Sequence, residues 1–127
     1  MTKQYDIAIV GATGVVGESM LEILSERKFP VGKIHALASE RSVGNKVSFG
    51  NRELTVEDLA DFDFSKVQIG LFSAGGSISA EFAPRAVEAG CVVIDNTSHF
   101  RYDDDIPLVV PEVNEEAIAE HTTRGII

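Results

Sequence analysis

The chain has 127 residues, of which 44% are hydrophobic, enough for one folded domain with a single core. Its 20 acidic and 11 basic residues give a formal charge of −9, opposite in sign to a surface that binds DNA or RNA. No apolar run is long enough to span a membrane, and the N-terminus does not resemble a signal peptide. The single cysteine, Cys91, excludes an internal disulfide. We therefore expect a cytoplasmic protein with neither a membrane nor a nucleic acid as partner.

Short apolar runs predict strands that are buried on both faces, because most of them lack polar alternation. They cover residues 6–10, 34–38, 67–72, 92–95 and 108–110. Residues 40–65 interrupt this pattern with glycines and asparagines, and they predict a small hairpin. Residues 114–121 form a polar helical stretch, and "RGII" after it resembles a strand that has just begun.

Two helices are expected between these strands. In the first, four apolar side chains recur on one helical face, which should pack on the sheet: Val16, Met20, Ile23 and Leu24. The second covers residues 77–89 and directs Ile78, Phe82 and Val87 inward. Pro84 either kinks this helix or lies in its first turn, and Gly90 ends it. The alternation predicts an α/β fold of Rossmann-like type, with a doubly wound, mostly parallel sheet.

A glycine-rich turn links the first strand to the first helix. Gly11, Gly14 and Gly17 have the spacing G-x-x-G-x-x-G. The first permits a tight turn, the second lets a phosphate approach the backbone, and the third lets the helix pack on the strand. Amide groups at the start of the helix can then bind a pyrophosphate: those of Thr13, Gly14, Val15 and Val16. The alternative is a structural turn without a ligand, but the strand–turn–helix context favours a dinucleotide.

The residues after the second strand bear on which dinucleotide binds. An NAD site usually presents an acidic residue there to the ribose 2′-hydroxyl. Here the chain has Ser39, Arg41 and Ser42, whose hydroxyls and guanidinium suit a 2′-phosphate. This composition favours NADP over NAD. Glu40 weakens that preference, because its carboxylate could serve a ribose instead.

Four motifs in this chain together resemble the N-terminal region of the aspartate-β-semialdehyde dehydrogenase family, in the same order and over almost the whole length. They are "GATGVVG", "ALASERSVG", "SAGGSIS" and "VIDNTSHFRYDDDIPLVVPEVN". The resemblance implies an NADP-dependent enzyme that reversibly converts L-aspartyl-4-phosphate to the semialdehyde with release of phosphate. That reaction lies on the branch to lysine, threonine, methionine and isoleucine.

The same resemblance implies roles for individual residues. Thr13 to Val16 would contact the pyrophosphate, and Arg41 with Ser42 would contact the adenosine end. Ser73, Ala74, Gly75 and Gly76 would line the nicotinamide side. Asn96 would lie where cofactor and substrate meet, and Arg101 would hold the phosphate of the substrate. These segments follow predicted strands, so they should meet at the carboxyl edge of the sheet, where parallel sheets bind ligands. An Arg101 outside such a motif would more commonly pair with Asp103, Asp104 or Asp105.

We find no catalytic residue for this chemistry in the sequence, because a thiolate nucleophile and a general base are required. Cys91 opens a strand at its amino end, far from the ligand edge, and is expected to be a small buried residue. His35 is expected in the core or at a sheet edge and His121 in solvent, while His99 lies in the site loop without matching the motif. No residues have convincing metal-ligand spacing.

The family places its nucleophile in an "NPNC" motif soon after a segment like "RGII", and its base in a separate substrate domain. We therefore expect residues 1–127 to form an NADP-binding domain that binds the cofactor without turnover. In that reading the substrate and dimerisation domain is absent, and the parent protein is a homodimer or homotetramer that acts on a small-molecule substrate.

Three alternatives remain open. N-acetyl-γ-glutamyl-phosphate reductase shares the architecture and the thiol chemistry, although its glycine turn usually carries an aromatic where this chain has Val15 and Val16. Short-chain dehydrogenases also contain "GATGxxG", but the Tyr-x-x-x-Lys pair is absent, since Ile106 lies four residues after Tyr102. The third alternative is a non-catalytic NADP-binding module.

Overall fold

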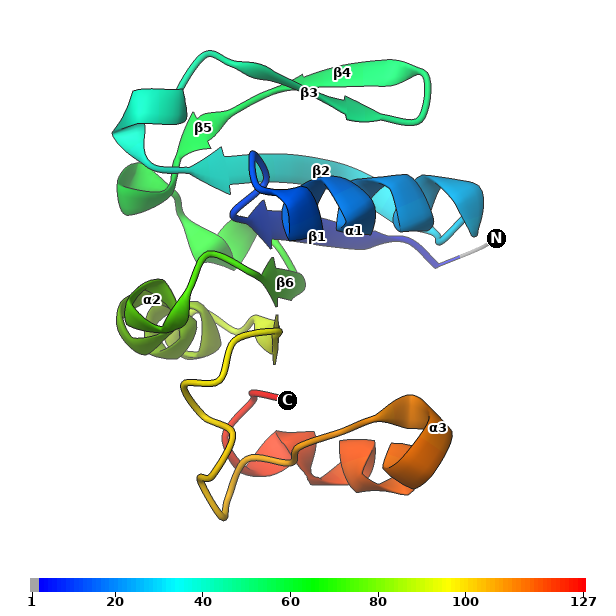
Figure 1. Ribbon diagram of the computed structural model, residues 1–127, viewed down its shortest axis with the longest axis vertical. Helices are drawn as coiled ribbons and strands as arrows, with labels where there is room; N and C mark the ends of the chain where they lie inside the picture. Colours follow the sequence, from blue (N-terminus) through cyan, green and yellow to red (C-terminus); the bar gives the residue numbers. More distant parts are fainter. Residues whose placement is uncertain (1–2) are drawn as a thin grey trace.

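The computed structural model describes residues 3–127 and has the predicted α/β architecture, with helices on both faces of a parallel sheet (Figure 1). The strands are β1 (Tyr5–Val10), β2 (Val31–Ala38), β3 (Lys46–Phe49), β4 (Arg52–Thr55), β5 (Glu57–Asp58), β6 (Ile69–Phe72) and β7 (Val92–Asp95). The helices are α1 (Val15–Glu26), α2 (Gly76–Glu88) and the short α3 (Pro111–Asn114). Four 3-10 segments complete the chain: η1 (Glu40–Ser42), η2 (Leu59–Asp61), η3 (Phe64–Lys66) and η4 (Glu115–Thr123).

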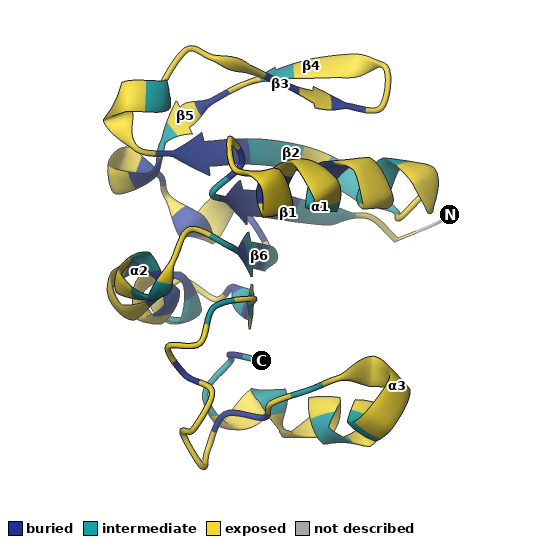
Figure 2. Ribbon diagram, viewed as in Figure 1, coloured by how far each residue is buried: buried dark blue, intermediate teal, exposed yellow. Residues whose placement is uncertain are grey.

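The main sheet has the order β5-β2-β1-β6-β7, and all its neighbouring strands run parallel. Successive residues of β1 enter different cores. Ile7 and Ile9 pack on the α1 side with Leu21, whereas Ala8 and Val10 pack on the α2 side with Phe82. Every one of these positions is buried. Figure 2 shows the carboxyl-terminal part of β1 in dark blue, the colour of buried residues. The apolar runs lack polar alternation because both faces of the sheet are covered.

Helix α1 packs through a different stripe from the one predicted. Gly17 and Leu21 are buried and Leu24 packs against the same core, whereas Val16 is 42% exposed and Ile23 is 49% exposed. The prediction of an inward Val16 and Ile23 is therefore wrong. The cause is Gly17, where an added Cβ would lie 2.2 Å from the carbonyl oxygen of Gly11. This close approach sets the rotation of the helix, so the residues four and seven positions later also face the sheet.

Helix α2 is continuous through Pro84, which lies well past its first turn, so the first-turn alternative is excluded. Phe82 is buried as predicted, and Ile78 and Val87 pack partly against the same core. Gly90 adopts a φ of +96° and donates its N–H to the Val87 carbonyl at 2.9 Å. The predicted glycine end of this helix is confirmed.

The hairpin predicted within residues 40–65 is confirmed as β3 and β4, which pair antiparallel over Gly50 and Asn51. Val47 and Phe49 bury their side chains in the core on the α1 side. The short β5 was not predicted. It extends the main sheet through the pairs Leu37 with Glu57 and Ala38 with Asp58.

The C-terminal part lies beyond β7, at the opposite end of the molecule from the hairpin (Figure 1). The strand predicted at residues 108–110 is wrong. The Asn114 side chain accepts from the Val110 N–H and donates to the Leu108 carbonyl, both at 2.8 Å, and these backbone groups therefore make no sheet pairing. The expected strand start in "RGII" is confirmed, because Ile126 forms a parallel bridge with Val93.

The glycine contact predicts a measurable difference in stability. Gly17→Ala should lower the free energy of unfolding by about 1–3 kcal/mol, because the new methyl group would overlap backbone atoms that cannot rotate away. Gly14→Ala is the control, since its Cβ would lie 3.5 Å from the Gly11 carbonyl, an ordinary contact. Urea unfolding followed by circular dichroism measures both variants. Equal stability of the two would contradict this packing account.

Candidate functional site

A cavity of about 610 Å³ opens at the carboxyl edge of the sheet. It lies between β1 and β6, where the strand order reverses. From β1 the chain continues through α1 to β2 on one side, and from β6 it continues through α2 to β7 on the other side. Open α/β sheets bind ligands at this kind of switch point. The cavity is lined by the glycine turn, the end of β2, the β5–η2 segment, the loop after β6 and α2: Gly11, Thr13, Gly14, Ala38, Ser39, Glu40, Asp58, Leu59, Ala60, Ser73, Ala74, Ile78, Glu81 and Phe82.

The glycine turn is held against both neighbouring strand ends. Gly11 adopts a φ of +92° and donates its N–H to the Leu37 carbonyl at 2.9 Å. A Cβ at Gly11 would lie 3.1 Å from the backbone of Ala74. The glycine turn therefore contacts the loop after β6 directly, and a side chain at Gly11 would separate them.

The amino end of α1 presents amide groups that have no backbone acceptor. Glu18 makes the first bond of this helix, to the Gly14 carbonyl at 3.0 Å. Among residues 3–127, the N–H groups of Thr13, Val15, Val16 and Gly17 make no backbone hydrogen bond. Gly14 differs from the prediction, because its N–H donates to the Gly11 carbonyl at 3.1 Å. The unpaired amides and the helix dipole can bind an anionic group such as a pyrophosphate.

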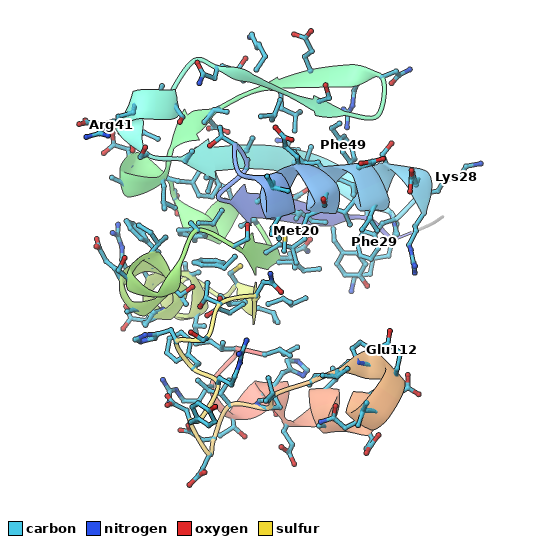
Figure 3. All side chains as sticks on the ribbon, viewed as in Figure 1. Met20, Lys28, Phe29, Arg41, Phe49 and Glu112 are labelled. Atoms are coloured by element: carbon cyan, nitrogen blue, oxygen red, sulfur yellow. The ribbon has the colours of Figure 1, made fainter. Side chains whose placement is uncertain are left out.

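The end of β2 separates the residues that were predicted to contact the adenosine. Ser39 lines the cavity, and so does Glu40. Arg41 and Ser42 belong to the adjoining η1 turn and do not line it. The Arg41 side chain extends from this turn away from the sheet (Figure 3). The cation predicted to select NADP thus lies outside the cavity, next to a carboxylate that lies inside it.

One wall of the cavity was not predicted from the sequence. Asp58, Leu59 and Ala60 form this wall, in which the Asp58 carboxylate accepts from the Ala60 N–H at 3.0 Å. The two residues of β5 carry no apolar run, so no strand was predicted there. The opposite wall includes Phe82, whose helical spacing predicted only a core role.

The loop after β6 is partly in the cavity. Ser73 lines it and is fixed by the Val10 carbonyl, which accepts from the Ser73 N–H at 3.0 Å and from its hydroxyl at 3.3 Å. Ala74 also lines the cavity. Gly75 and Gly76 do not line it; Gly75 is the N-cap of α2, with a φ of +100°, and Gly76 is the first residue of the helix.

A network of short polar side chains fixes the loop after β7. The Asp95 carboxylate accepts from the Ser79 hydroxyl at 2.9 Å, from the Thr97 N–H at 2.8 Å and from the Thr97 hydroxyl at 3.0 Å. Ser79 is fully buried on α2. Asn96 lies between these anchors, outside the cavity lining, and donates its N–H to the Phe72 carbonyl at 2.8 Å.

Arg101 lies apart from the large cavity. It lines a separate small pocket of about 20 Å³, together with Thr97 and other residues that follow β7. Asp105 and Asp103 pair with Arg124, at 3.0 and 4.0 Å. Within the described part of the chain Arg101 forms no ion pair, so it does not pair with the acidic residues beside it. The Arg101 guanidinium is exposed and available to an external anion.

The remaining candidates for chemistry are unsuitable. Cys91 is 2% exposed, and burial raises the pKa of its thiol to about 11. His35 lies 2.7 Å from the Glu57 carboxylate, and His99 packs edge-on against Phe100. His121 is half-buried, with its Nδ1 2.8 Å from the Ile118 carbonyl, so it is less exposed than predicted.

Two other features, a metal-binding cluster and a membrane-spanning helix, are absent from the described residues. Between residues 3 and 127, no three His, Cys, Asp or Glu side chains are grouped so that they could hold a metal ion. In the same range, no helix combines the length and apolar character needed to cross a membrane.

The buried thiol predicts low reactivity. Because the pKa of Cys91 is raised above the value of an unfolded thiol, near 9, the protein stabilises the protonated form. This contribution to stability is fully present below about pH 9 and is lost as the pH rises toward 11. At pH 8, Ellman's reagent should modify Cys91 only after denaturant is added. Rapid modification of the folded chain would contradict this assignment.

The Asp95 network predicts a second effect on stability. Ser79→Ala removes the buried hydroxyl and should lower the free energy of unfolding by about 1 kcal/mol, because one bond to a carboxylate is lost. Ser77→Ala is the matched control, since Ser77 is exposed on the same helix and the change in helix propensity is the same. Thermal and urea unfolding measure both. A Ser79→Ala chain as stable as Ser77→Ala would count against the network.

Comparisons with known proteins agree with this geometry. A family model described as the semialdehyde dehydrogenase NAD binding domain matches residues 6–121. Aspartate-semialdehyde dehydrogenase 2 of Vibrio cholerae is 61% identical over all 127 residues, and aspartate-semialdehyde dehydrogenase of a Shewanella species is 55% identical over the same span. The chain spans 38% of the length of each of these relatives.

Solved structures give the same result. The crystal structure of aspartate semialdehyde dehydrogenase II from Vibrio cholerae complexed with ASA has a TM-score of 0.95 and 62% identity, covering 98% of this chain and 41% of that one. The enzyme from Candida albicans with NADP has a TM-score of 0.77 and 27% identity, covering 92% of this chain and 36% of that one. A nicotinamide dinucleotide is thus the supported class of cofactor. Because the family model covers most of its length, the chain belongs to the family of semialdehyde dehydrogenase NAD-binding domains.

Proposed function

We propose that this chain is the NADP-binding domain of an aspartate-semialdehyde dehydrogenase. That enzyme reversibly converts L-aspartyl-4-phosphate and NADPH to L-aspartate 4-semialdehyde, phosphate and NADP, in amino-acid biosynthesis. The observation that carries the proposal is the row of unpaired amides at the start of α1, beside a cavity of about 610 Å³. The high identity to relatives of that name supports this enzyme over the related reductase.

The residues at this edge of the sheet fit a dinucleotide. The pyrophosphate would lie on the amides of Thr13, Val15 and Val16, where Gly14 has no side chain to obstruct it. The adenosine would lie in the cavity between the wall that includes Leu59 and the wall that includes Phe82. Bound there, the cofactor supplies a hydride, while the residues of this chain bind and orient it.

The selection of NADP would come from the turn at the end of β2. Arg41 and Ser42 lie just outside the cavity, and Ser39 lies inside it. In our proposal the 2′-phosphate projects from the ribose toward η1, where the guanidinium can bind it in two-pronged fashion.

The nicotinamide side would lie along the loop after β6, where Ser73 and Ala74 line the cavity and Gly75 and Gly76 begin α2. Asn96 is held near this loop by the Phe72 carbonyl. We propose that Arg101 holds the phosphate of the substrate, because its guanidinium is exposed and has no ion pair within residues 3–127.

The catalytic groups would come from outside residues 1–127. Cys91 lies at the amino end of β7, opposite the cavity, and its raised pKa makes it a poor source of thiolate. We therefore propose that this chain alone binds the cofactor without turnover. In the complete enzyme, a further domain would add the nucleophile, the base and much of the subunit interface of a cytoplasmic homodimer or homotetramer.

Parallel titrations with NADPH and NADH test the cofactor. The chain should bind NADPH more tightly, and Arg41→Ala should weaken NADPH about tenfold or more while leaving NADH unchanged, because only NADPH carries the 2′-phosphate. Lys33→Ala removes the same charge from the opposite end of β2 and should change neither affinity. Isothermal titration calorimetry measures each dissociation constant. Equal weakening of both dinucleotides by Arg41→Ala would contradict the assigned 2′-phosphate site.

A further inference from the structure

Glu40 and Arg41 are adjacent and oppositely charged, but only one of them lines the cavity. Glu40 lines it, whereas Arg41 does not and extends away from the sheet (Figure 3). Both belong to η1, which begins directly after β2 and Ser39. Of these two neighbours, only the acidic residue contributes to the lining of the cavity.

The charged residues that line the cavity are all carboxylates: Glu40, Asp58 and Glu81. Asp58 already accepts from the Ala60 N–H at 3.0 Å, and Glu81 lies 3.8 Å from the Arg85 guanidinium. Glu40 forms neither a side-chain hydrogen bond nor an ion pair within residues 3–127. Among the three carboxylates that line the cavity, Glu40 is thus the one with neither a side-chain hydrogen bond nor an ion pair within the described residues.

The place of Glu40 in the fold suits a ribose. An acidic side chain at the end of the second strand can accept a hydrogen bond from a ribose 2′-hydroxyl. The same carboxylate repels a 2′-phosphate, because two negative groups then face each other across a short distance. Glu40 and Arg41 should consequently act in opposite directions on the two dinucleotides.

We propose that Glu40 is a specificity-determining residue that accepts the 2′-hydroxyl of NADH and opposes the 2′-phosphate of NADPH. This assignment rests on the proposed function of the cavity and deepens it. The chain carries determinants for both cofactors, and its preference for NADPH stays within about tenfold, because one charge favours the phosphate and one opposes it. The chain therefore binds NADH as well as NADPH.

Charge removal at Glu40 tests this assignment. Glu40→Gln keeps the shape of the side chain and removes its charge, and calorimetric titration with NADPH and NADH measures the effect. The variant should bind NADPH about tenfold more tightly, as expected for loss of one charge facing a phosphate dianion. It should bind NADH with equal or lower affinity, so the preference for NADPH widens. Glu40→Ala, which also lacks the acceptor, should weaken NADH further.

Glu26→Gln is the matched control. Glu26 is exposed on α1 and lines the separate groove between α1 and the hairpin. Its substitution therefore removes the same charge at a place away from the cavity. It should leave both affinities unchanged. An equal shift of both dinucleotides by Glu40→Gln, or no shift of either, would overturn the assignment of Glu40 alone. An unsubstituted chain that is folded but binds neither dinucleotide would overturn the proposed function as well.

Discussion

The contact between Gly17 and the carbonyl oxygen of Gly11 determines how the rest of the candidate site is placed. A methyl group at Gly17 would lie 2.2 Å from that oxygen, so helix and turn can meet only at a glycine. The contact sets the rotation of α1 and brings its first amides to the carboxyl edge of the sheet. It also leaves Gly11 against Ala74, so the two loops that border the cavity are built on one another.

The opposite half of the edge depends on polar contacts. Ser79 is fully buried in α2, yet its hydroxyl reaches Asp95 at the end of β7. Thr97 donates both its N–H and its hydroxyl to the same carboxylate. The network thereby links the helix that borders the cavity to the loop that lines the small Arg101 pocket.

The sequence predicts the parts of this structure that one local pattern controls. Strands buried on both faces have continuous apolar runs, and the glycine spacing indicates the amides of α1. Residues 108–110 show the same kind of run, but the Asn114 side chain occupies their backbone groups, a contact that no periodicity reveals. The inward stripe of α1 also escaped prediction, since helical spacing permits neighbouring stripes and Gly17 decides between them. The wall around Leu59 lacked any motif, because β5 is only a backbone pairing with β2.

The most direct test of the central claim locates the bound dinucleotide on the chain. In amide-resolved NMR of the isotope-labelled protein, added NADPH should shift the signals of Thr13, Val15, Val16 and Gly17, whose N–H groups lack backbone acceptors. The signals of Lys46 and Ser48, in the groove between α1 and the hairpin, should stay unchanged. Saturable binding that leaves these four amides unshifted would contradict the claim that the amino end of α1 and the turn before it hold the cofactor.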